Sequence, residues 1–213
     1  SNRFGEISHE RYILGYPDGT FKAQRSLTRS ELAAIVARLI NGGNTDKKAS
    51  YSDVSNQHWA SGYISIATEN GIFTGYEDGR FRPDQAVTRE ELAAVMVRYL
   101  KLEAPASISN HFSDAAGRWS SAAIEALYRN GMIQGYVDGT FRPDNEITRL
   151  EAVGLINRML FRGPLADAPQ SFPDFPASKW GFGDVEEATV SHDATRNEDG
   201  SEKFVKQRED NVH

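Results

Sequence analysis

The chain has 213 residues, of which 39% are hydrophobic and 25% charged, values typical of a globular protein that can bury a core. Its formal net charge of −6 argues against a nucleic-acid partner, because duplex binding needs a concentrated basic surface. It has no cysteine and no apolar run near the roughly 20 residues that cross a bilayer, which excludes disulfides, thiolate sites and membrane insertion within this chain.

The first recognisable element is a turn. Residues 15–21 read Gly-Tyr-Pro-Asp-Gly-Thr-Phe, and an Asp-Gly pair between aromatic residues predicts a tight hairpin or turn. The pattern returns at 75–81 and 135–141, so the copies repeat every 60 residues. Units of this size cannot bury their apolar faces alone and are expected to share a core.

A capped helix is predicted after each turn. Thr28 and Glu31 have the spacing of a capping box, in which the hydroxyl accepts from a first-turn amide and the carboxylate reaches back to the cap. The block recurs at 88–91 and 148–151. The apolar residues that follow in the first copy lie on one helical face, and they are Leu32, Ile35, Val36, Leu39 and Ile40.

A tryptophan-bearing block precedes the second and third turns. It predicts helices near 59–70 and 119–130, each ended by a glycine. The first copy lacks this block, which reappears at 172–188. Because Trp180 aligns with Trp59 and Trp119, we expect this last helix to dock beside the first copy and close a ring. Residues 197–213 are expected to form a peripheral tail with a hairpin at Asp199-Gly200.

Together these elements predict a mainly α fold with about six helices. The expected architecture is a pseudo-threefold trimer of helix–hairpin–helix repeats within one monomeric chain, closed by a C-terminal half repeat. The expected boundaries are 1–44 for the second half of repeat 1, 45–104 for repeat 2, 105–165 for repeat 3, and 166–213 for the half repeat that completes repeat 1, with its tail; all belong to one structural domain.

Three arginines are the leading candidates for ligand binding. Arg29, Arg89 and Arg149 each follow a helix cap, where the helix dipole disfavours a cation by about 0.3–1 kcal/mol. A guanidinium beside exposed first-turn amides can instead bind a carboxylate with bidentate hydrogen bonds. On exposed helix starts these arginines would contribute little to folding. The structural alternative is that each pairs with a turn aspartate or a first-turn glutamate.

Two further groups are weaker candidates for ligand contact. Trp59, Trp119 and Trp180 could stack on sugar faces, although a tryptophan at a helix end is more often core or rim packing. The Asp-Gly pairs are turn residues first and ligand contacts second; these are Asp18, Gly19, Asp78, Gly79, Asp138 and Gly139.

Metal and catalytic sites are not predicted. His58, His111 and His192 occupy dissimilar repeat positions without metal-ligand spacing. Residues 195–206 have Thr195 and Lys206 at the two end positions where a calcium loop has carboxylates. The sequence has no nucleophile elbow, phosphate loop or zinc-protease motif. We therefore expect no catalytic residue and no cofactor, and a wall-active hydrolase is the most remote function.

The repeated blocks resemble the S-layer homology family. Its signature combines Phe-x-Asp-Val…His-Trp-Ala, Gly-Tyr-x-Asp-Gly-x-Phe-x-Pro and Thr-Arg-Ala-Glu, and the permuted order here resembles C-terminal anchoring regions of clostridial surface proteins, including cellulosome scaffold anchors. Where the family has alanine after the arginine, this chain has Ser30, Glu90 and Leu150. We therefore expect the three grooves between repeats to differ from one another as binding sites.

The resemblance implies a secreted, non-catalytic module at the bacterial surface, fused to upstream cargo domains. It implies binding to a peptidoglycan-linked, anionic secondary cell-wall polysaccharide, commonly pyruvylated, through Arg29, Arg89 and Arg149 in the grooves. The alternative from a different class is a structural module for S-layer lattice or protein–protein contacts.

Overall fold

The computed structural model describes residues 5–213, which form two compact units. The first unit holds the residues up to Arg25 together with 38–44 and 148–213, and the second holds 26–37 and 45–147. Helix α1 (Arg29–Asn41) begins in the second unit and ends in the first. Its predicted capping box is confirmed, since the Thr28 amide donates to Glu31 Oε1 and the Glu31 amide donates to Thr28 Oγ1, both at 3.1 Å.

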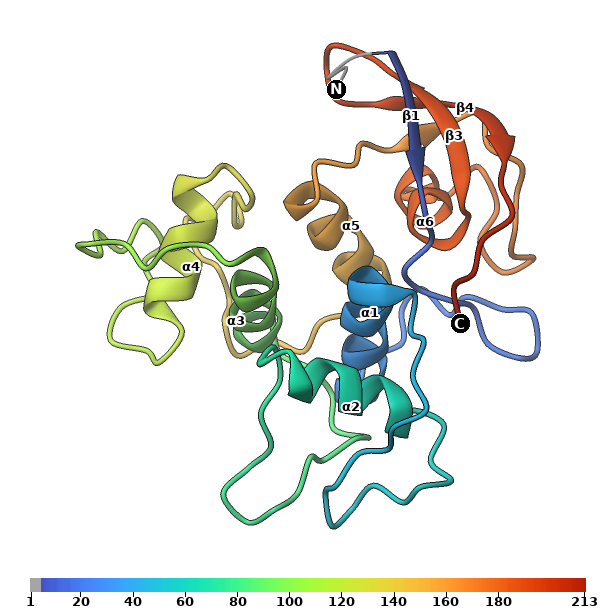
Figure 1. The fold of residues 1–213 in the computed structure, drawn as a ribbon. Helices are drawn as coiled ribbons and strands as arrows, with labels where there is room; N and C mark the ends of the chain where they lie inside the picture. The colour runs from blue at the N-terminus through green and yellow to red at the C-terminus, as the bar shows by residue number, and fades with distance from the viewer. Residues whose placement is uncertain (1–4) are drawn as a thin grey trace. The chain divides into compact units, whose positions relative to one another are not determined.

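The second unit contains three further helices. These are α2 (Ser61–Glu69), α3 (Arg89–Leu100) and α4 (Ser121–Arg129), shown in Figure 1. The Thr88 hydroxyl caps α3 by accepting from the Glu91 amide. Helix α3 packs against α4, and Leu92, Met96 and Ile124 are buried in this unit. The capped helix of one copy thus packs on the tryptophan-bearing helix of the next.

Three equivalent residues of the second unit form a closed cycle of backbone hydrogen bonds. Leu27 N donates to Ile147 O at 2.9 Å, Val87 N to Leu27 O at 2.8 Å, and Ile147 N to Val87 O at 3.0 Å. All three side chains are fully buried. Each residue directly precedes a threonine at the start of a helix, and the cycle joins the three copies through their backbones within the second unit.

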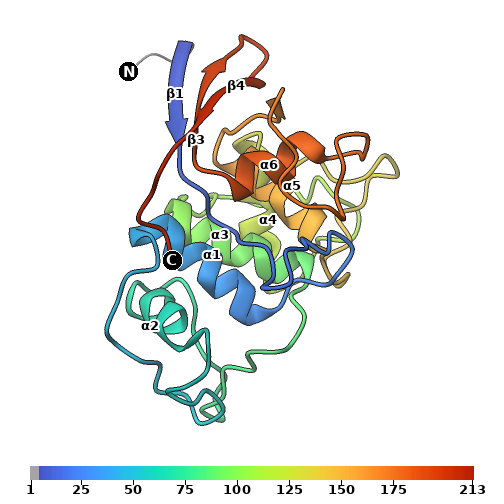
Figure 2. The ribbon, with the colours of Figure 1, turned by 90° about the vertical axis from the view of Figure 1, so that its right-hand side faces the viewer.

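The first unit combines two helices with a sheet. Helices α5 (Arg149–Met159) and α6 (Phe182–Thr189) pack together. The strands are β1 (Gly5–His9), β2 (Leu165–Ala166), β3 (His192–Arg196) and β4 (Glu202–Gln207), in the sheet order β1-β3-β4-β2. β3 is antiparallel to β1 and β4, while β2 runs parallel to β4. Figures 1 and 2 show α6 beside these strands.

The predicted mainly α fold class is wrong. Helices hold about 30% of the residues and strands about 11%, and the sheet is mixed. It was missed because β3 and β4 read HDATR and EKFVKQ, polar sequences without apolar alternation. Residues 202–207, expected within a tail, form β4, and the chain turns at Asp199-Gly200 to reach it.

Conversely, the Gly-Tyr-x-Asp-Gly segments are turns without strands. Tyr16 N donates to Thr20 O at 2.8 Å and Gly19 N donates to Tyr16 O at 2.9 Å, which closes the loop at its neck without a ladder. The same pair of hydrogen bonds closes the segments at 75–81 and 135–141. The predicted short two-stranded pieces are therefore absent from all three of these segments, each of which lies in the described part of the chain.

The C-terminal segment contacts the first copy within the first unit. Tyr12 N donates to Ala188 O at the end of α6, at 2.9 Å. The Asp174 carboxylate accepts from the amides of Phe21 and Lys22, both at 2.9 Å. These contacts join segments from opposite ends of the sequence. The domain boundaries given above stay predictions.

Candidate functional site

The three first-turn arginines are buried, not exposed. Their exposed fractions are 6% for Arg29, 6% for Arg89 and 2% for Arg149, so the expectation of exposed side chains is wrong. Each Nε donates to a carbonyl oxygen in a Gly-Tyr turn. The bonds run from Arg29 to Phe81 at 2.8 Å, from Arg89 to Phe141 at 2.7 Å and from Arg149 to Phe21 at 2.9 Å. Each arginine therefore supports the turn of another copy.

Each buried guanidinium also faces the tyrosine of that turn. The Cζ-to-centroid distance is 4.8 Å from Arg29 to Tyr76, and the equivalent distances are 4.9 Å at Tyr136 and 4.5 Å at Tyr16, within cation–π range. Arg29 Nη1 additionally lies 3.6 Å from Glu91 Oε2, the kind of first-turn ion pair left open as the structural alternative. Burial raises the pKa of Glu91 although Arg29 opposes the shift.

A second cation lies over each tyrosine, and sequence reasoning missed it. Lys22 Nζ is 4.6 Å from the Tyr16 centroid, and Arg82 Cζ is 3.8 Å from that of Tyr76. In the third copy Arg142 Cζ is 3.6 Å from the Tyr136 centroid. These side chains are between 39% and 43% exposed, so solvent reaches them. Each tyrosine ring thus carries one buried cation and at least one exposed cation; over Tyr16, Arg25 Cζ is a further one, 5.1 Å from the centroid.

The exposed cations stand on an unusual backbone. Lys22, Arg82 and Arg142 have φ values of 57°, 59° and 59°, the left-handed region that costs a non-glycine residue about 1–2 kcal/mol. An aspartate holds each one there by accepting from its amide, for example Asp53 from Arg82 at 2.8 Å. The sequence did contain a sign of these residues, because a cation directly follows the phenylalanine of every copy.

The Asp-Gly pairs build the turn and neutralise part of this charge. Asp18 accepts from the Thr20 hydroxyl at 2.6 Å and from the Thr20 amide at 3.0 Å, and these hydrogen bonds lower the pKa of Asp18 to about 2. Lys22 Nζ lies 3.2 Å from Asp18 Oδ2. The other turn aspartates pair similarly, Asp78 with Arg82 at 3.7 Å and Asp138 with Arg142 at 3.5 Å. The turn glycines have positive φ, namely Gly19, Gly79 and Gly139.

The three tryptophans are exposed, with fractions of 57% for Trp59, 64% for Trp119 and 83% for Trp180. In the second unit, both sequence neighbours of Trp119 bind the residue after Arg89. Arg118 Nε donates to Glu90 Oε1 at 3.0 Å, and the Ser120 hydroxyl donates to the same oxygen at 2.8 Å. This places the Trp119 backbone at the start of α3, close to the buried arginine.

A different contact occurs at the equivalent place in the first unit. Gly181, which follows Trp180, lies so close to Leu150 that an added Cβ would stand 2.8 Å from Leu150 Cδ1. Apolar packing here replaces the ion pair and hydrogen bonds that Glu90 makes. The residues after Arg89 and Arg149 therefore hold the neighbouring tryptophan segments in different ways.

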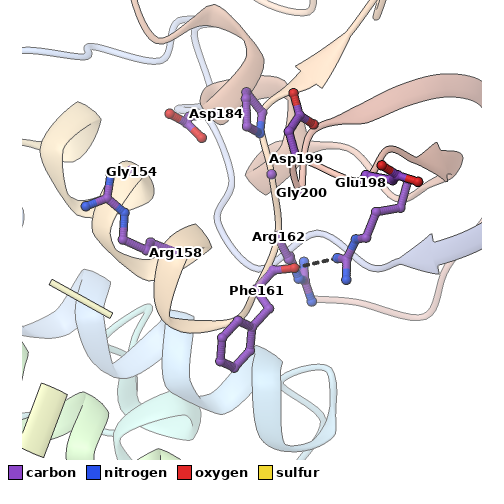
Figure 3. Close-up of a pocket in the computed structure, with 11 residues that line it drawn as sticks. Gly154, Arg158, Phe161, Arg162, Asp184, Glu198, Asp199 and Gly200 are labelled. Carbon is purple, nitrogen blue, oxygen red and sulfur yellow. Dashed lines mark hydrogen bonds between the residues drawn. The ribbon is translucent and has the colours of Figure 1, made fainter. Parts of the chain in front are cut away.

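A separate pocket lies in the first unit and contains none of the predicted site residues. Its volume is about 890 Å³, and Figure 3 shows it with arginines and acidic side chains on its walls. The arginines contact the protein itself, since Arg196 donates to the Phe161 carbonyl and Arg162 Nη1 to Glu10 O at 2.8 Å. The charged lining residues are Arg158, Arg162, Asp184, Arg196, Glu198 and Asp199.

The chain belongs to the S-layer homology family. The family model for the S-layer homology domain matches residues 7–33, 50–93 and 111–153, which include the three turns and the three helix starts. The predicted family and the predicted bacterial cell-surface location are confirmed. In the described range, every helix is too short or too polar to cross a membrane.

Three of the proteins that this chain is similar to are longer than the chain itself. The chain is 45% identical over 216 residues to Cell surface glycoprotein 1 of Acetivibrio thermocellus, covering 95% of this chain and 9% of that protein. It is 38% identical to the Cellulosome-anchoring protein of the same organism, covering 94% and 47% respectively. An S-layer protein of Bacillus thuringiensis subsp. finitimus is 30% identical over 62% of the chain, which spans 15% of that protein. The chain therefore spans less than half the length of these relatives.

Proposed function

We propose that this chain is a non-catalytic anchoring module that binds a peptidoglycan-linked, anionic secondary cell-wall polysaccharide. The proposal rests on one observation, the threefold recurrence of a tyrosine that carries a buried arginine and an exposed cation. A polymer with regularly spaced acidic sugars matches a protein with repeated cationic positions. The family and the anchoring function named for one relative support the same reading.

The proposal assigns different roles to the two cations. Lys22, Arg82 and Arg142 are accessible and would contact an acidic group of the polymer directly. Arg29, Arg89 and Arg149 would add positive potential from a less hydrated position and hold the tyrosine and turn in place. The Asp-Gly turns orient the exposed cations, because each turn aspartate pairs with one.

The left-handed backbone at the exposed cations is a further support. Glycine would adopt φ near 58° without strain, yet all three copies keep a cationic side chain there. Residues held in strained conformations concentrate at binding sites. The exposed tryptophans add apolar faces on which sugar rings can stack, the weaker of the two roles considered for them from sequence.

Cosedimentation with purified cell-wall sacculi tests this function. The decisive variant changes Lys22, Arg82 and Arg142 to alanine together, and a matched control changes the exposed Lys48, Lys203 and Lys206. Each lost charge-assisted contact weakens its site by about 1.5–3 kcal/mol. Because linked sites reinforce one another, single variants lose little and the triple variant loses binding. The control variant is expected to bind sacculi as strongly as the parent protein does.

The same assay separates the alternative function. Sacculi stripped of their secondary polymer should bind none of the proteins. If the triple variant sediments with intact sacculi as well as the parent does, the exposed cations are not the binding site. Binding to stripped sacculi, or self-assembly of the chain alone, would instead favour a lattice or protein–protein module. Substituting the buried arginines is less informative, because their loss also removes support from the turns.

A further inference from the structure

Four ionisable side chains from four different elements meet inside the first unit. His9 ends β1, Glu187 lies in α6, His192 begins β3 and Glu202 begins β4. The side chains of Glu187, His192 and Glu202 are fully buried, and that of His9 is 18% exposed. One ligand atom from each residue lies within 4.8 Å of all the others. None of these residues belongs to the proposed polysaccharide site.

Three of the separations between these atoms match a tetrahedral metal site. His9 Nδ1 is 3.4 Å from Glu187 Oε1 and 3.3 Å from Glu202 Oε1, and His192 Nε2 is 3.5 Å from Glu202 Oε1. Ligands placed about 2.0–2.2 Å from a tetrahedral zinc ion are about 3.4 Å apart. The shortest contact, 2.5 Å between His192 Nε2 and Glu187 Oε2, is the one that an ion would widen.

Neighbouring groups orient two of the ligands as metal sites require. His192 Nδ1 lies 2.5 Å from Val190 O, so that nitrogen donates its proton and Nε2 faces the carboxylates. Glu202 Oε2 accepts from the Gly163 amide at 3.2 Å and from Arg196 at 3.3 Å, which turns Oε1 toward the imidazoles. A ligating histidine that donates its other N–H to a backbone carbonyl is the usual arrangement around bound metals.

Glu187 supplies an independent indication of a ligand. Both its carboxylate oxygens and His9 Nδ1 are buried without a well-aligned hydrogen bond from any described residue. The nearest polar neighbours of the carboxylate are the two imidazoles, His9 Nδ1 at 3.4 Å and His192 Nε2 at 2.5 Å. Buried polar atoms are nearly always satisfied, because an unpaired carboxylate inside a protein is costly. The unsatisfied atoms all point into the space between the two imidazoles and the two carboxylates.

We propose that His9, Glu187, His192 and Glu202 bind one zinc ion. Two imidazole nitrogens and two carboxylate oxygens form a donor set suited to zinc, whereas calcium and magnesium prefer oxygen ligands alone. The ion would join β1 to α6 and to both strands of the β3–β4 hairpin. It is a structural clip between the two ends of the sequence, with all four positions occupied by protein.

The test titrates zinc chloride into the full chain after removal of metals with EDTA, by calorimetry at pH 8. One ion should bind per chain. Cobalt(II) at the same site should give the intense visible absorption of a tetrahedral complex. At zinc concentrations 100-fold above the Kd, the first unit should melt about 10–20 °C higher. The absence of saturable zinc binding, or an octahedral cobalt spectrum, would overturn the proposal.

Two ligand variants and one control complete the test. His9→Gln and Glu187→Gln should each weaken zinc binding by at least about 100-fold. Such a loss exceeds the effect of removing a hydrogen bond that only supports a ligand. His111→Gln removes an exposed histidine of the second unit and should leave the affinity unchanged. Unaltered affinity in His9→Gln refutes the site even if Glu187→Gln does not fold, because the partly exposed His9 is tolerant of substitution. The measurement needs no polysaccharide, so it is independent of the proposed function.

Discussion

The turns at 135–141 and 15–21 are held by the same interaction through very different lengths of chain. Asp114 accepts from the amides of Phe141 and Arg142 at 2.8 and 2.9 Å, across 27 and 28 residues. Asp174 accepts from Phe21 and Lys22 at 2.9 Å, across 153 and 152 residues. The same residue types thus give the same hydrogen-bond geometry between a turn and its aspartate. Closing the longer loop costs about 1.5 kcal/mol more in chain entropy.

Deleting every residue after Gln170 should have the largest effect on this comparison. The deletion removes Asp174, α6, β3 and β4, and it uncovers the face of α5 on which α6 packs. Loss of 200 Å² of buried apolar surface would cost roughly 5 kcal/mol, comparable with the stability of a whole domain. We expect the first unit to lose its cooperative thermal transition. An unchanged melting midpoint would show that the C-terminal segment is dispensable.

Removing the aspartates one at a time should have an intermediate effect. Asp174→Ala and Asp114→Ala each leave two backbone amides without their carboxylate acceptor, and each should destabilise its own unit by about 2–3 kcal/mol. Urea unfolding monitored through the amide NMR signals of each unit measures both losses of stability. Equal losses of unfolding free energy in the two variants would mean that the length of chain between a turn and its aspartate does not alter the strength of their contact. A difference above about 1 kcal/mol would contradict the equivalence of the two turns.

The smallest effect should come from the threonines inside the two turns. Hydrogen bonds from Thr20 lower the pKa of Asp18 to about 2, and those from Thr140 lower the pKa of Asp138. Thr20→Val and Thr140→Val should raise these pKa values, as NMR titration would show, while Thr20→Ser should preserve the low value. A lowered carboxylate pKa stabilises the fold above pH 4, and this contribution is lost as the pH falls toward 2. Unmoved titrations would assign the shifts to the amides of residues 20 and 140 and to Lys22 and Arg142, not to the threonine hydroxyls.

Local chemistry was predictable from the sequence where it depends on near neighbours. Thr28 and Glu31 form the expected capping box because both partners lie within one helical turn. The buried state of Arg29 was not predictable in the same way, since the Phe81 carbonyl and the Tyr76 ring come from another copy. An argument from the helix dipole alone therefore predicted the wrong exposure for the arginine side chain.

Long-range pairing accounts for what the sequence did not reveal. Strand β1 pairs with β3 from the opposite end of the chain, and neither sequence has a strong apolar alternation. His192 was judged against His58 and His111 and not against its partner His9, because His9 has no periodic relation to it. The exposed cations at Lys22, Arg82 and Arg142 required the backbone φ and the tyrosine contact to be recognised.

The cycle formed by Leu27, Val87 and Ile147 limits how this protein can vary in copy number. Open repeat arrays gain or lose units freely, because each end offers the same stacking surface. Here each of the three residues spends its one amide and its carbonyl on the other two. Inserting or deleting a copy must open this cycle, which leaves a buried donor and a buried acceptor unpaired, at about 1–3 kcal/mol for each group, until a cycle of another size closes. The closed cycle therefore opposes a change in the number of copies, whereas sequence change within a copy need not open it.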